Sequence, residues 1–350
     1  MPTFTAPQLL AMGQRILVAA GVSEADAGVV AAELRDANLV GHDSHGVMRL
    51  MQYLDSMRQG FVKPHAQAEV VIDKPAFAVI DGKFQFGQVT AARALQMGLE
   101  KAKACGTATV MARNCNHVGR LGAYSQRAAE RGFASMMCVN APGPGGVAPY
   151  GGIDRRLGTN PISMSAPRGT QPLVLDMTSS ATAEGKLRVA FQKGEQVPPG
   201  LIIDCDGNAT TDPATFYANP GGALLPLGGA LGFKGFGLSA MIDVFGGILS
   251  GSGICRTDLP RGANGVWMYF VDVEQFLPRS EYDALIDKYV AYIKSSRRQS
   301  GCDEILMPGE IELRRQAQRE RDGVPIPDET WRQIRELAAS VGASLEGIGA

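Results

Sequence analysis

Histidine is scarce in this chain, at four of 350 residues: His42, His45, His65 and His117. An excess of charge of either sign is also missing, because 34 Lys and Arg residues nearly balance 35 Asp and Glu residues, for a formal net charge of −1. Without a basic field, the chain has nothing that would attract the phosphates of nucleic acid or an anionic membrane surface. Neither is expected as a partner.

The chain also lacks an uninterrupted apolar run of about 20 residues, the length that spans a bilayer. Its first 21 residues carry no basic start followed by an apolar core, and their apolar spacing predicts a structural helix rather than a signal peptide. The six cysteines are scattered and form no C-x-x-C pair. We therefore expect reduced thiols, a cytoplasmic protein and no metal site.

At 350 residues, 45% of them apolar, the chain is longer than the roughly 250–300 residues at which one core stops growing, so two lobes are expected. Helices and strands are mixed along it, which predicts a mixed α/β fold. Predicted helices cover 7–21, 24–40, 44–60, 89–104, 121–131, 234–250, 280–298, 308–321 and a segment from 328. Predicted strands cover 66–81, 107–112, 133–139, 172–177, 200–204, 265–273 and 304–307. Regular βαβ alternation is absent, and neither a GxGxxG turn nor a P-loop is present, so any nucleotide must use a different cradle.

The most informative stretch is Asp43-Ser44-His45-Gly46, followed by Arg49. On one helix, His45 and Arg49 would share a face with Cβ atoms roughly 5–6 Å apart. Such a pair suits a small acid whose carboxylate docks on Arg49 while its neighbouring oxygen meets His45. The structural alternative is that Asp43 or Ser44 caps the helix and His45 packs in its first turn.

Two further segments lie where ligands commonly bind. His117, Val118, Gly119 and Arg120 stand between a predicted strand and a helix start, where backbone N–H groups attract anions and Arg120 would add a cation for a phosphate. The turn Met177-Thr178-Ser179 follows a predicted strand, and Thr159 lies in another turn reached from the glycine-rich 141–152 loop. An ordinary loop around His117, and a capping role for Thr178 or Ser179, are the alternatives.

The remaining candidates are lysines and a tight turn. Lys234 and Gly235 lie in the glycine-rich run 228–237 that leads into a nearly uncharged helix. A cation there opposes the helix dipole at a cost of about 0.3–1 kcal/mol, which a bound phosphate would offset. Lys186 follows Gly185, and most such lysines are solvated surface. Pro308, Gly309 and Glu310 form a tight turn that opens a helix.

Taken in order, these segments resemble the type-2 malate/L-lactate dehydrogenase family, NAD(P)-dependent oxidoreductases whose cofactor domain is not a Rossmann fold. The matching motifs are DSHGVMRL at 43–50, NHVGRLGAY at 116–124, VAPYGG and LGTNP within 147–161, LDMTSS with GK within 175–186, LPLGG with KGFGL within 225–238, and MPGE at 307–310. The GRLG variant after His117 is most similar to the hydroxycarboxylate dehydrogenase branch.

The resemblance implies a homodimer with two domains: a helical substrate and dimerisation domain at 1–115 plus 300–350, and a non-Rossmann NAD(P)-binding domain at 116–299. It implies that His45 is the proton donor, that Ser44 orients it, that Arg49 holds the substrate carboxylate, and that Thr159 lies at the substrate–nicotinamide junction. The residues implied for the NAD or NADP pocket are Val118, Gly119, Arg120, Met177, Thr178, Ser179, Lys186, Lys234, Gly235, Pro308, Gly309 and Glu310.

The implied reaction is reversible hydride transfer between NAD(P)H and a small 2-oxo acid. Some family members use the histidine that matches His117 as the base, so His45 and His117 compete for one role, and the arginine one turn away favours His45. A cyclic imine reductase is the alternative enzyme; such relatives carry an acid close to Lys186, which argues against that relay here. A nucleotide-binding scaffold is the alternative outside enzymes.

Overall fold

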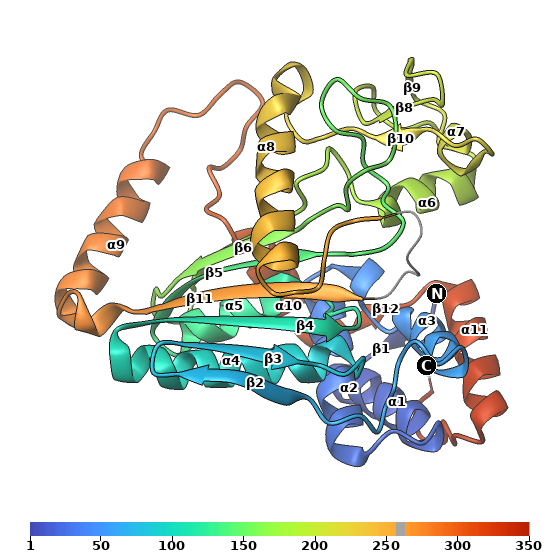
Figure 1. Cartoon of the computed structure of the whole chain (residues 1–350), viewed down its shortest axis with the longest axis horizontal. Helices are drawn as coiled ribbons and strands as arrows, with labels where there is room; N and C mark the ends of the chain where they lie inside the picture. Colours follow the sequence, from blue (N-terminus) through green and yellow to red (C-terminus); the bar gives the residue numbers. More distant parts are fainter. Residues whose placement is uncertain (257–262, 350) are drawn as a thin grey trace.

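The structure is a computed structural model that describes residues 1–256 and 263–349. Within them the largest sheet has seven strands in the order β2-β3-β4-β11-β5-β6-β7 (Figure 1). Their bounds are β2 (Glu69–Lys74), β3 (Phe77–Asp81), β4 (Thr107–Cys115), β5 (Phe133–Asn140), β6 (Ile162–Ala166), β7 (Leu173–Met177) and β11 (Asn264–Asp272). Only β3 and β4 pair in parallel among these neighbours. The predicted mixed α/β fold is confirmed.

Helices cover both faces of this sheet. Helices α4 (Gly87–Cys105) and α5 (Leu121–Glu130) pack on one face, and α8 (Gly232–Ile242) with the π-helical segment η3 (Asp243–Ile248) packs on the other (Figure 1). The approach of α4 is close, because a Cβ on Gly98 would lie 2.1 Å from a ring carbon of Phe270 in β11. A glycine in mid-helix is explained here by packing rather than by flexibility.

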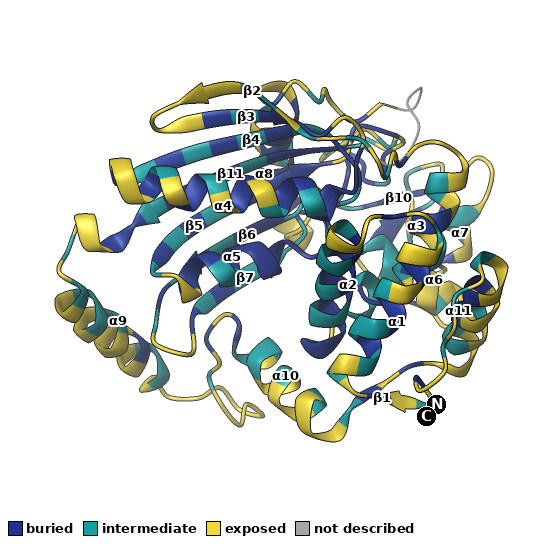
Figure 2. Cartoon of the chain, turned by 90° about the horizontal axis from the view of Figure 1, so that it is seen from below, coloured by how far each residue is buried: buried dark blue, intermediate teal, exposed yellow. Residues whose placement is uncertain are grey.

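A helical lobe combines both chain ends, as the resemblance implies. The two-stranded pair β1–β12 joins the ends, and one apolar core runs through the lobe. Figure 2 shows buried residues on the first three helices of the chain and on its last helix, whereas the helix Glu310–Asp322 has none. The elements are β1 (Thr3–Phe4), α1 (Ala6–Ala19), α2 (Glu24–Leu39), η1 (Asp43–His45), α3 (Arg49–Arg58), α10 (Glu310–Asp322), β12 (Val324–Pro325) and α11 (Asp328–Val341).

The remaining elements form a smaller unit and an outlying helix. A three-stranded sheet in the order β10-β8-β9 has its own core of Val147, Leu187, Ile202, Phe216 and their neighbours. Its elements are α6 (Glu184–Lys193), β8 (Ile202–Ile203), β9 (Ala209–Thr210), α7 (Ala214–Tyr217), β10 (Ala223–Leu224) and η2 (Gly229–Leu231). After β11 come η4 (Val273–Gln275) and α9 (Arg279–Lys294).

The division of the chain into 1–115 plus 300–350 and 116–299 stays a prediction. Strands β2, β3 and β4, which that division gives to the first domain, hydrogen-bond into the same sheet as β5, β6, β7 and β11. The predicted boundary therefore falls inside one continuous sheet, at the edge between β4 and the loop that carries His117.

Three predicted elements differ from the structure. The strand expected at 66–81 is a hairpin of β2 and β3, and the strand expected at 304–307 is irregular chain. The helix expected at 44–60 is split into η1 and α3. Gly46 separates these two, and its extended ψ of −157° ends the first turn before α3 begins at Arg49.

One helical stretch differs from the expectation about membranes. Of the described residues, Gly229–Ile248 is long and apolar enough to cross a membrane by length and composition. It arises because η2, α8 and η3 run on as one rod, which includes Lys234 and the buried Asp243. In the structure this rod packs on the central sheet. The six cysteines are free, and the described residues contain no group of three metal-ligating side chains.

Candidate active site

The turn that carries Ser44 and His45 contacts Arg49 in a different way from the one predicted. Because η1 and α3 are separate, the two residues do not share one helix face. Instead Arg49 reaches back, and its Nε donates to the backbone oxygen of Ser44 at 2.6 Å. The Ser44 hydroxyl lies 3.1 Å from Nδ1 of His45. The predicted proximity is correct, but a side-chain to backbone hydrogen bond produces it.

Side chains from α2 and α10 hold this turn. Asp43 accepts two hydrogen bonds from Arg319 of α10, at 2.6 and 3.0 Å, and one from Asn38 of α2 at 2.7 Å. The other end of the Asn38 amide accepts from Val47 N at 2.8 Å. A Cβ on Gly46 would lie 2.1 Å from this amide, so only glycine fits. Asp43 is therefore an anchor of the turn rather than a helix cap.

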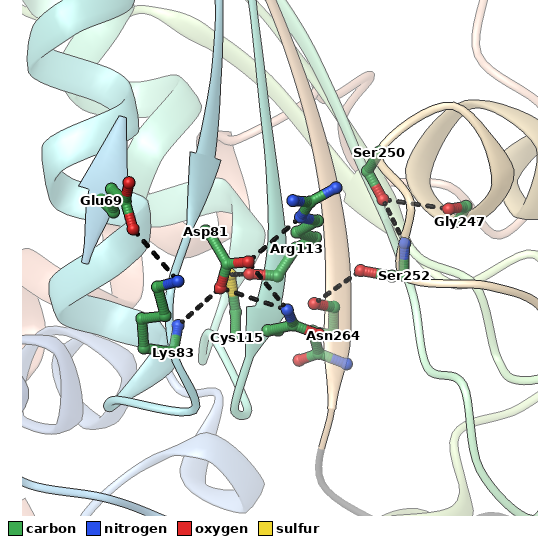
Figure 3. Close-up of polar contacts among 10 residues, drawn as sticks. Glu69, Asp81, Lys83, Arg113, Cys115, Gly247, Ser250, Ser252 and Asn264 are labelled. Atoms are coloured by element: carbon green, nitrogen blue, oxygen red, sulfur yellow. Dashed lines mark hydrogen bonds and ion pairs between the residues drawn. The ribbon is translucent and has the colours of Figure 1, made fainter. Parts of the chain in front are cut away.

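The second histidine follows the end of β4, which a buried carboxylate holds in place. Figure 3 shows Asp81 at the centre of these contacts, with Lys83 and Arg113 around it. Asp81 accepts from Lys83 N at 3.0 Å, from Arg113 Nε at 3.2 Å and from Asn114 Nδ2 at 3.1 Å. Burial alone would raise the pKa of Asp81, but these hydrogen bonds lower it. The carboxylate thus ties the loop after β3 to the end of β4.

Asn116 continues this anchoring up to the histidine. Its amide nitrogen donates to three backbone oxygens, those of Phe61, Phe84 and Gln85, at 2.7–3.1 Å. The start of α4 packs against the same backbone, since a Cβ on Gly87 would lie 2.0 Å from Asn116 O and 2.5 Å from His117 O. His117 is therefore presented from a fixed backbone.

The two histidines meet face to face. The rings of His45 and His117 are stacked, with centroids 5.4 Å apart and planes inclined by 23°. Tyr53 of α3 hydrogen-bonds Nδ1 of His117 at 2.8 Å. From the other side, Gly185 in the first turn of α6 packs on Ser44, because a Cβ there would lie 3.4 Å from Ser44 Cβ. Three separate parts of the chain thus converge on the histidine pair.

Both imidazoles are neutral at pH 7. Burial, followed by the charges of Arg49, His42 and Arg120, lowers the pKa of His45 to about 3. Burial, followed by Arg49 and His45, also lowers the pKa of His117 well below its ordinary value. In the free protein neither ring is therefore an imidazolium that could act as an acid.

Acid is expected to destabilise the protein through this pair. In the unfolded chain a histidine takes up a proton near pH 6.5, whereas folded His45 does so only near pH 3. Between these values the unfolded state binds more protons, so the free energy of unfolding falls with falling pH by up to about 1.4 kcal/mol per pH unit per histidine. Urea unfolding from pH 7 to 4.5 should show a shallower fall for His45→Asn than for the wild type. The exposed His65 provides the control, because His65→Asn should keep the wild-type slope.

Three of the predicted cofactor segments come together near β7. Asp176 in β7 accepts from Gly122 N at 2.8 Å, and its Oδ2 lies 3.5 Å from Arg120 Nε. On the neighbouring stretch of β7, Val174 N donates to Pro308 O at 3.1 Å. The segments 118–120, 176–179 and 307–310 are therefore close in space, as the resemblance requires.

The sequence suggests Arg120 as a cation for a phosphate, and the structure places this residue in the interior. It is 4% exposed and lies beside Asp176, and its Nε is buried without a hydrogen bond. Gly119 and Gly309 adopt φ of +82° and +92°, so these turns bring bare backbone to the same region. An unsatisfied buried donor beside two glycine turns fits a nicotinamide dinucleotide, which Val118, Gly119, Met177 and Pro308 would contact. Glu310 instead closes its own turn, by bonds from Met307 N at 3.0 Å and Lys294 at 2.7 Å.

The turns at 159 and 177–179 are joined directly. Ser179 donates to Thr159 O from its backbone at 3.0 Å and from its hydroxyl at 3.1 Å. The Thr178 hydroxyl donates to Ser180 O at 3.2 Å and so closes the turn. The alternative of a capping role is wrong, because the next helix, α6, begins at Glu184 with Ala183 as its N-cap. The backbone and the exposed parts of Met177 and Thr159 remain for ligand contact.

The two predicted lysines are exposed. Within the described residues, neither Lys186 nor Lys234 takes part in an ion pair. Lys234 lies in the first turn of α8, and this turn is fixed to the 177–179 turn through Leu227, whose N donates to Ser179 O at 2.9 Å. Gly235 permits that contact, since a Cβ there would lie 2.2 Å from Leu227 O. Lys234 is therefore the better placed of the two to reach a cofactor phosphate.

The site also contains residues that the sequence did not single out. Tyr53 contacts His117, and Gln88 contacts Tyr53. Asn38 and Arg319 hold the turn that carries Ser44 and His45. Tyr53 had a signal, because it lies one turn after Arg49 in a predicted helix. The others carry none, since their partners are far away in the chain.

Comparison with known proteins identifies the family. Residues 4–335 match the malate/L-lactate dehydrogenase family. The chain belongs to this family. Malate dehydrogenase of Pyrococcus horikoshii is 40% identical over 342 residues, covering 95% of this chain and 93% of the relative. Hydroxycarboxylate dehydrogenase B of Escherichia coli is 35% identical over 353 residues, covering 99% and 96%.

Solved structures of family members superpose closely. The Pyrococcus horikoshii malate dehydrogenase structure gives a TM-score of 0.89 at 35% identity, covering 98% of this chain and 96% of that one. A delta1-piperideine-2-carboxylate reductase of Pseudomonas syringae gives 0.84 at 28% identity, covering 97% and 100%. The chain is thus an oxidoreductase of the 2-hydroxy acid class, and the imine reductase is a more distant neighbour.

Proposed function

We propose that this protein is an NAD(P)-dependent 2-hydroxy acid dehydrogenase that interconverts a small 2-oxo acid plus NAD(P)H and a proton with the 2-hydroxy acid plus NAD(P)⁺. The observation that carries the proposal is the stacked pair of His45 and His117 beside Arg49. A proton carrier and a carboxylate-binding cation are the two groups that this substrate class needs. The bound nicotinamide supplies or accepts the hydride.

Each side chain has a distinct task in this proposal. Arg49 holds the substrate carboxylate, with charge-assisted hydrogen bonds of about 1.5–3 kcal/mol. Its Nη2 makes no hydrogen bond to a described residue and is available for that contact. Ser44 orients His45 through Nδ1. His45 exchanges a proton with the substrate oxygen.

The electrostatics give the two directions different requirements. Oxidation needs a base, and His45 is neutral and ready in the free protein. Reduction needs a protonated His45, which the positive charge of Arg49 opposes. A substrate carboxylate on Arg49 offsets that charge and raises the pKa of His45, so the anionic substrate itself prepares the acid.

The test is NADH and NADPH oxidation across a panel of 2-oxo acids, with piperideine-2-carboxylate and pyrroline-2-carboxylate alongside. Turnover of one or more 2-oxo acids supports the proposal. Faster turnover of the imines would favour the cyclic imine reductase. If no compound of the panel led to oxidation of NADH or NADPH, the result would favour a nucleotide-binding scaffold. The acid nearest to Lys186 in sequence, Glu184, pairs with Arg188 at 2.8 Å, which favours the 2-oxo acids.

The proposal includes a homodimer and a cytoplasmic location. The rod formed by α8 and η3 leaves large apolar side chains in solvent, among them Ile248 at 55% and Leu249 at 54% exposure. A monomeric protein rarely exposes such a face. The charged residues Lys234 and Asp243 make the same rod a poor membrane span. The exposed apolar face is therefore better explained as the surface that packs against a second copy of the chain. The six free thiols suit a reducing compartment.

Ile248→Asp is expected to shift the protein from dimer to monomer, because a carboxylate would be buried without a partner in the interface. Light scattering coupled to size-exclusion chromatography measures the mass directly. Phe77→Asp is the control: Phe77 is 46% exposed but lies on the β2–β3 hairpin, away from α8. That control should leave the mass unchanged. A monomeric wild type, or equal effects of both variants, would contradict the proposed interface.

A further inference from the structure

His117 is attached to a buried hydrogen-bonded chain that the proposed reaction does not by itself explain. Gln88 Nε2 lies 2.6 Å from the hydroxyl of Tyr53, and that hydroxyl lies 2.8 Å from Nδ1 of His117. Gln88 is fully buried and Tyr53 is 3% exposed. The first turn of α4 supplies Gln88 and the second turn of α3 supplies Tyr53, so two helices fix the chain.

The direction of the hydrogen bonds follows from the donors available. A tyrosine hydroxyl has one proton to donate. Because Gln88 donates to the Tyr53 oxygen, the Tyr53 proton is left for Nδ1 of His117. The opposite amide orientation of Gln88 would leave a buried NH₂ group without a partner, whereas the present one leaves only the oxygen Oε1 unpaired. A buried orphan N–H is the rarer and costlier case.

His45 lacks such a constraint. Its Nδ1 meets the hydroxyl of Ser44, which can rotate to donate or to accept. The proton on Nδ1 of His45 can therefore come and go with the state of the ring. On His117 the same nitrogen is permanently engaged as an acceptor. Both residues are histidines, but only in His45 can Nδ1 gain or lose a proton without breaking a fixed hydrogen bond.

We propose that Tyr53 and Gln88 are positioning residues that hold His117 as the Nε2–H tautomer, so that His117 acts as a neutral hydrogen-bond donor while His45 carries the proton. This rests on the proposed dehydrogenase function. A fixed N–H beside the substrate oxygen stabilises the negative charge that develops there during reduction. No described residue accepts a hydrogen bond from Nε2 of His117, which leaves it for a ligand.

The direct test reads the tautomer in the protein without ligands. The chain has four histidines, so ¹⁵N-histidine labelling gives a simple spectrum in which His117→Gln identifies the His117 signals. The wild type should show an unprotonated Nδ1 and a protonated Nε2 on His117, and Tyr53→Phe should lose this fixed pattern. Tyr124→Phe is the matched control, because Tyr124 is equally buried but donates to Val118 O at 2.6 Å and touches no histidine nitrogen.

Kinetics provide the second readout. Tyr53→Phe should lower kcat about tenfold, the equivalent of one neutral hydrogen bond, with the KM for NAD(P)H unchanged. Tyr124→Phe should stay within about twofold of the wild type. His117→Gln, whose amide N–H replaces Nε2–H, should also lose only about tenfold. A proton carrier replaced in the same way would lose about 10²–10⁴.

The proposal is overturned by a protonated Nδ1 on His117 in the wild type, by equal effects of Tyr53→Phe and Tyr124→Phe, or by a loss in His117→Gln as large as that in His45→Gln. Failure of the dehydrogenase function itself would look different. The wild type would then fail to oxidise NAD(P)H in the presence of any 2-oxo acid, while the tautomer of His117 could still be read from the spectrum.

Discussion

His45→Gln is expected to lower kcat for 2-oxo acid reduction by about 10²–10⁴, the usual contribution of a positioned proton donor. The amide keeps the approximate size of the ring but has no proton to exchange at neutral pH. The turn should survive, because Asp43, Asn38 and Arg319 hold it without help from the imidazole. NADH binding should therefore remain, and fluorescence titration can measure its Kd. Turnover equal to that of the wild type would remove His45 from the mechanism.

The pH profile identifies this role more specifically than the loss of rate. With the pKa of His45 at about 3 in the free protein, the protonated fraction falls tenfold for each pH unit above it. The wild-type kcat/KM for reduction should fall with that slope from pH 5 to 8, whereas kcat/KM for oxidation should stay flat. His45→Gln should lose the slope. The exposed His65→Gln should preserve both the rate and the profile.

The sequence predicted the histidine–arginine pair for a reason that is only partly correct. Their spacing suggested one helix face, but Gly46 breaks the helix, and Arg49 is near Ser44 because its Nε bonds a backbone oxygen. Spacing on a chain limits how far apart two groups can be, whatever the local structure. The proximity was therefore predictable, and the geometry was not.

Other parts of the site depend on contacts between distant segments. Asp43 accepts a hydrogen bond from Arg319, and Asp81 accepts one from Asn114, only because the folded chain brings α10 and β4 close to these carboxylates. Likewise, β11 enters the sheet between β4 and β5, although it follows both of them in the chain by more than 100 residues. Local periodicity carries no information about such pairings. A resemblance of motifs does predict such pairings, because members of one family share the same overall fold.

Arg120 illustrates the limit of assigning a role by residue type. A cation next to a glycine turn at a helix start suggested a phosphate ligand. In the structure its guanidinium lies in the interior beside Asp176, which belongs to a strand that the sequence did not connect with it. The contact of Arg120 with a cofactor phosphate stays a prediction, and the residue type gave no sign that this charge is buried.

Arg49→Lys is expected to raise the KM for the 2-oxo acid by about tenfold to a hundredfold and to leave the KM for NADH unchanged. Arginine offers a planar fork that matches a carboxylate, whereas lysine offers a single point charge. Losing one charge-assisted contact corresponds to about 1.5–3 kcal/mol. Steady-state kinetics with each substrate varied in turn measure both constants. Arg188→Lys is the control, because Arg188 is a nearby exposed arginine on α6 paired with Glu184.

A purely structural role for Arg49 predicts a different pattern. Its Nε holds the backbone of Ser44, and its Nη1 bonds Gln52, so it also braces the turn before α3. If bracing were its only task, Arg49→Lys would displace Ser44 and His45 and lower kcat, with the KM for the oxo acid nearly unchanged. The ammonium of lysine cannot serve Ser44, Gln52 and a carboxylate at once. A rise in KM that exceeds the fall in kcat therefore assigns the remaining guanidinium nitrogen to the substrate.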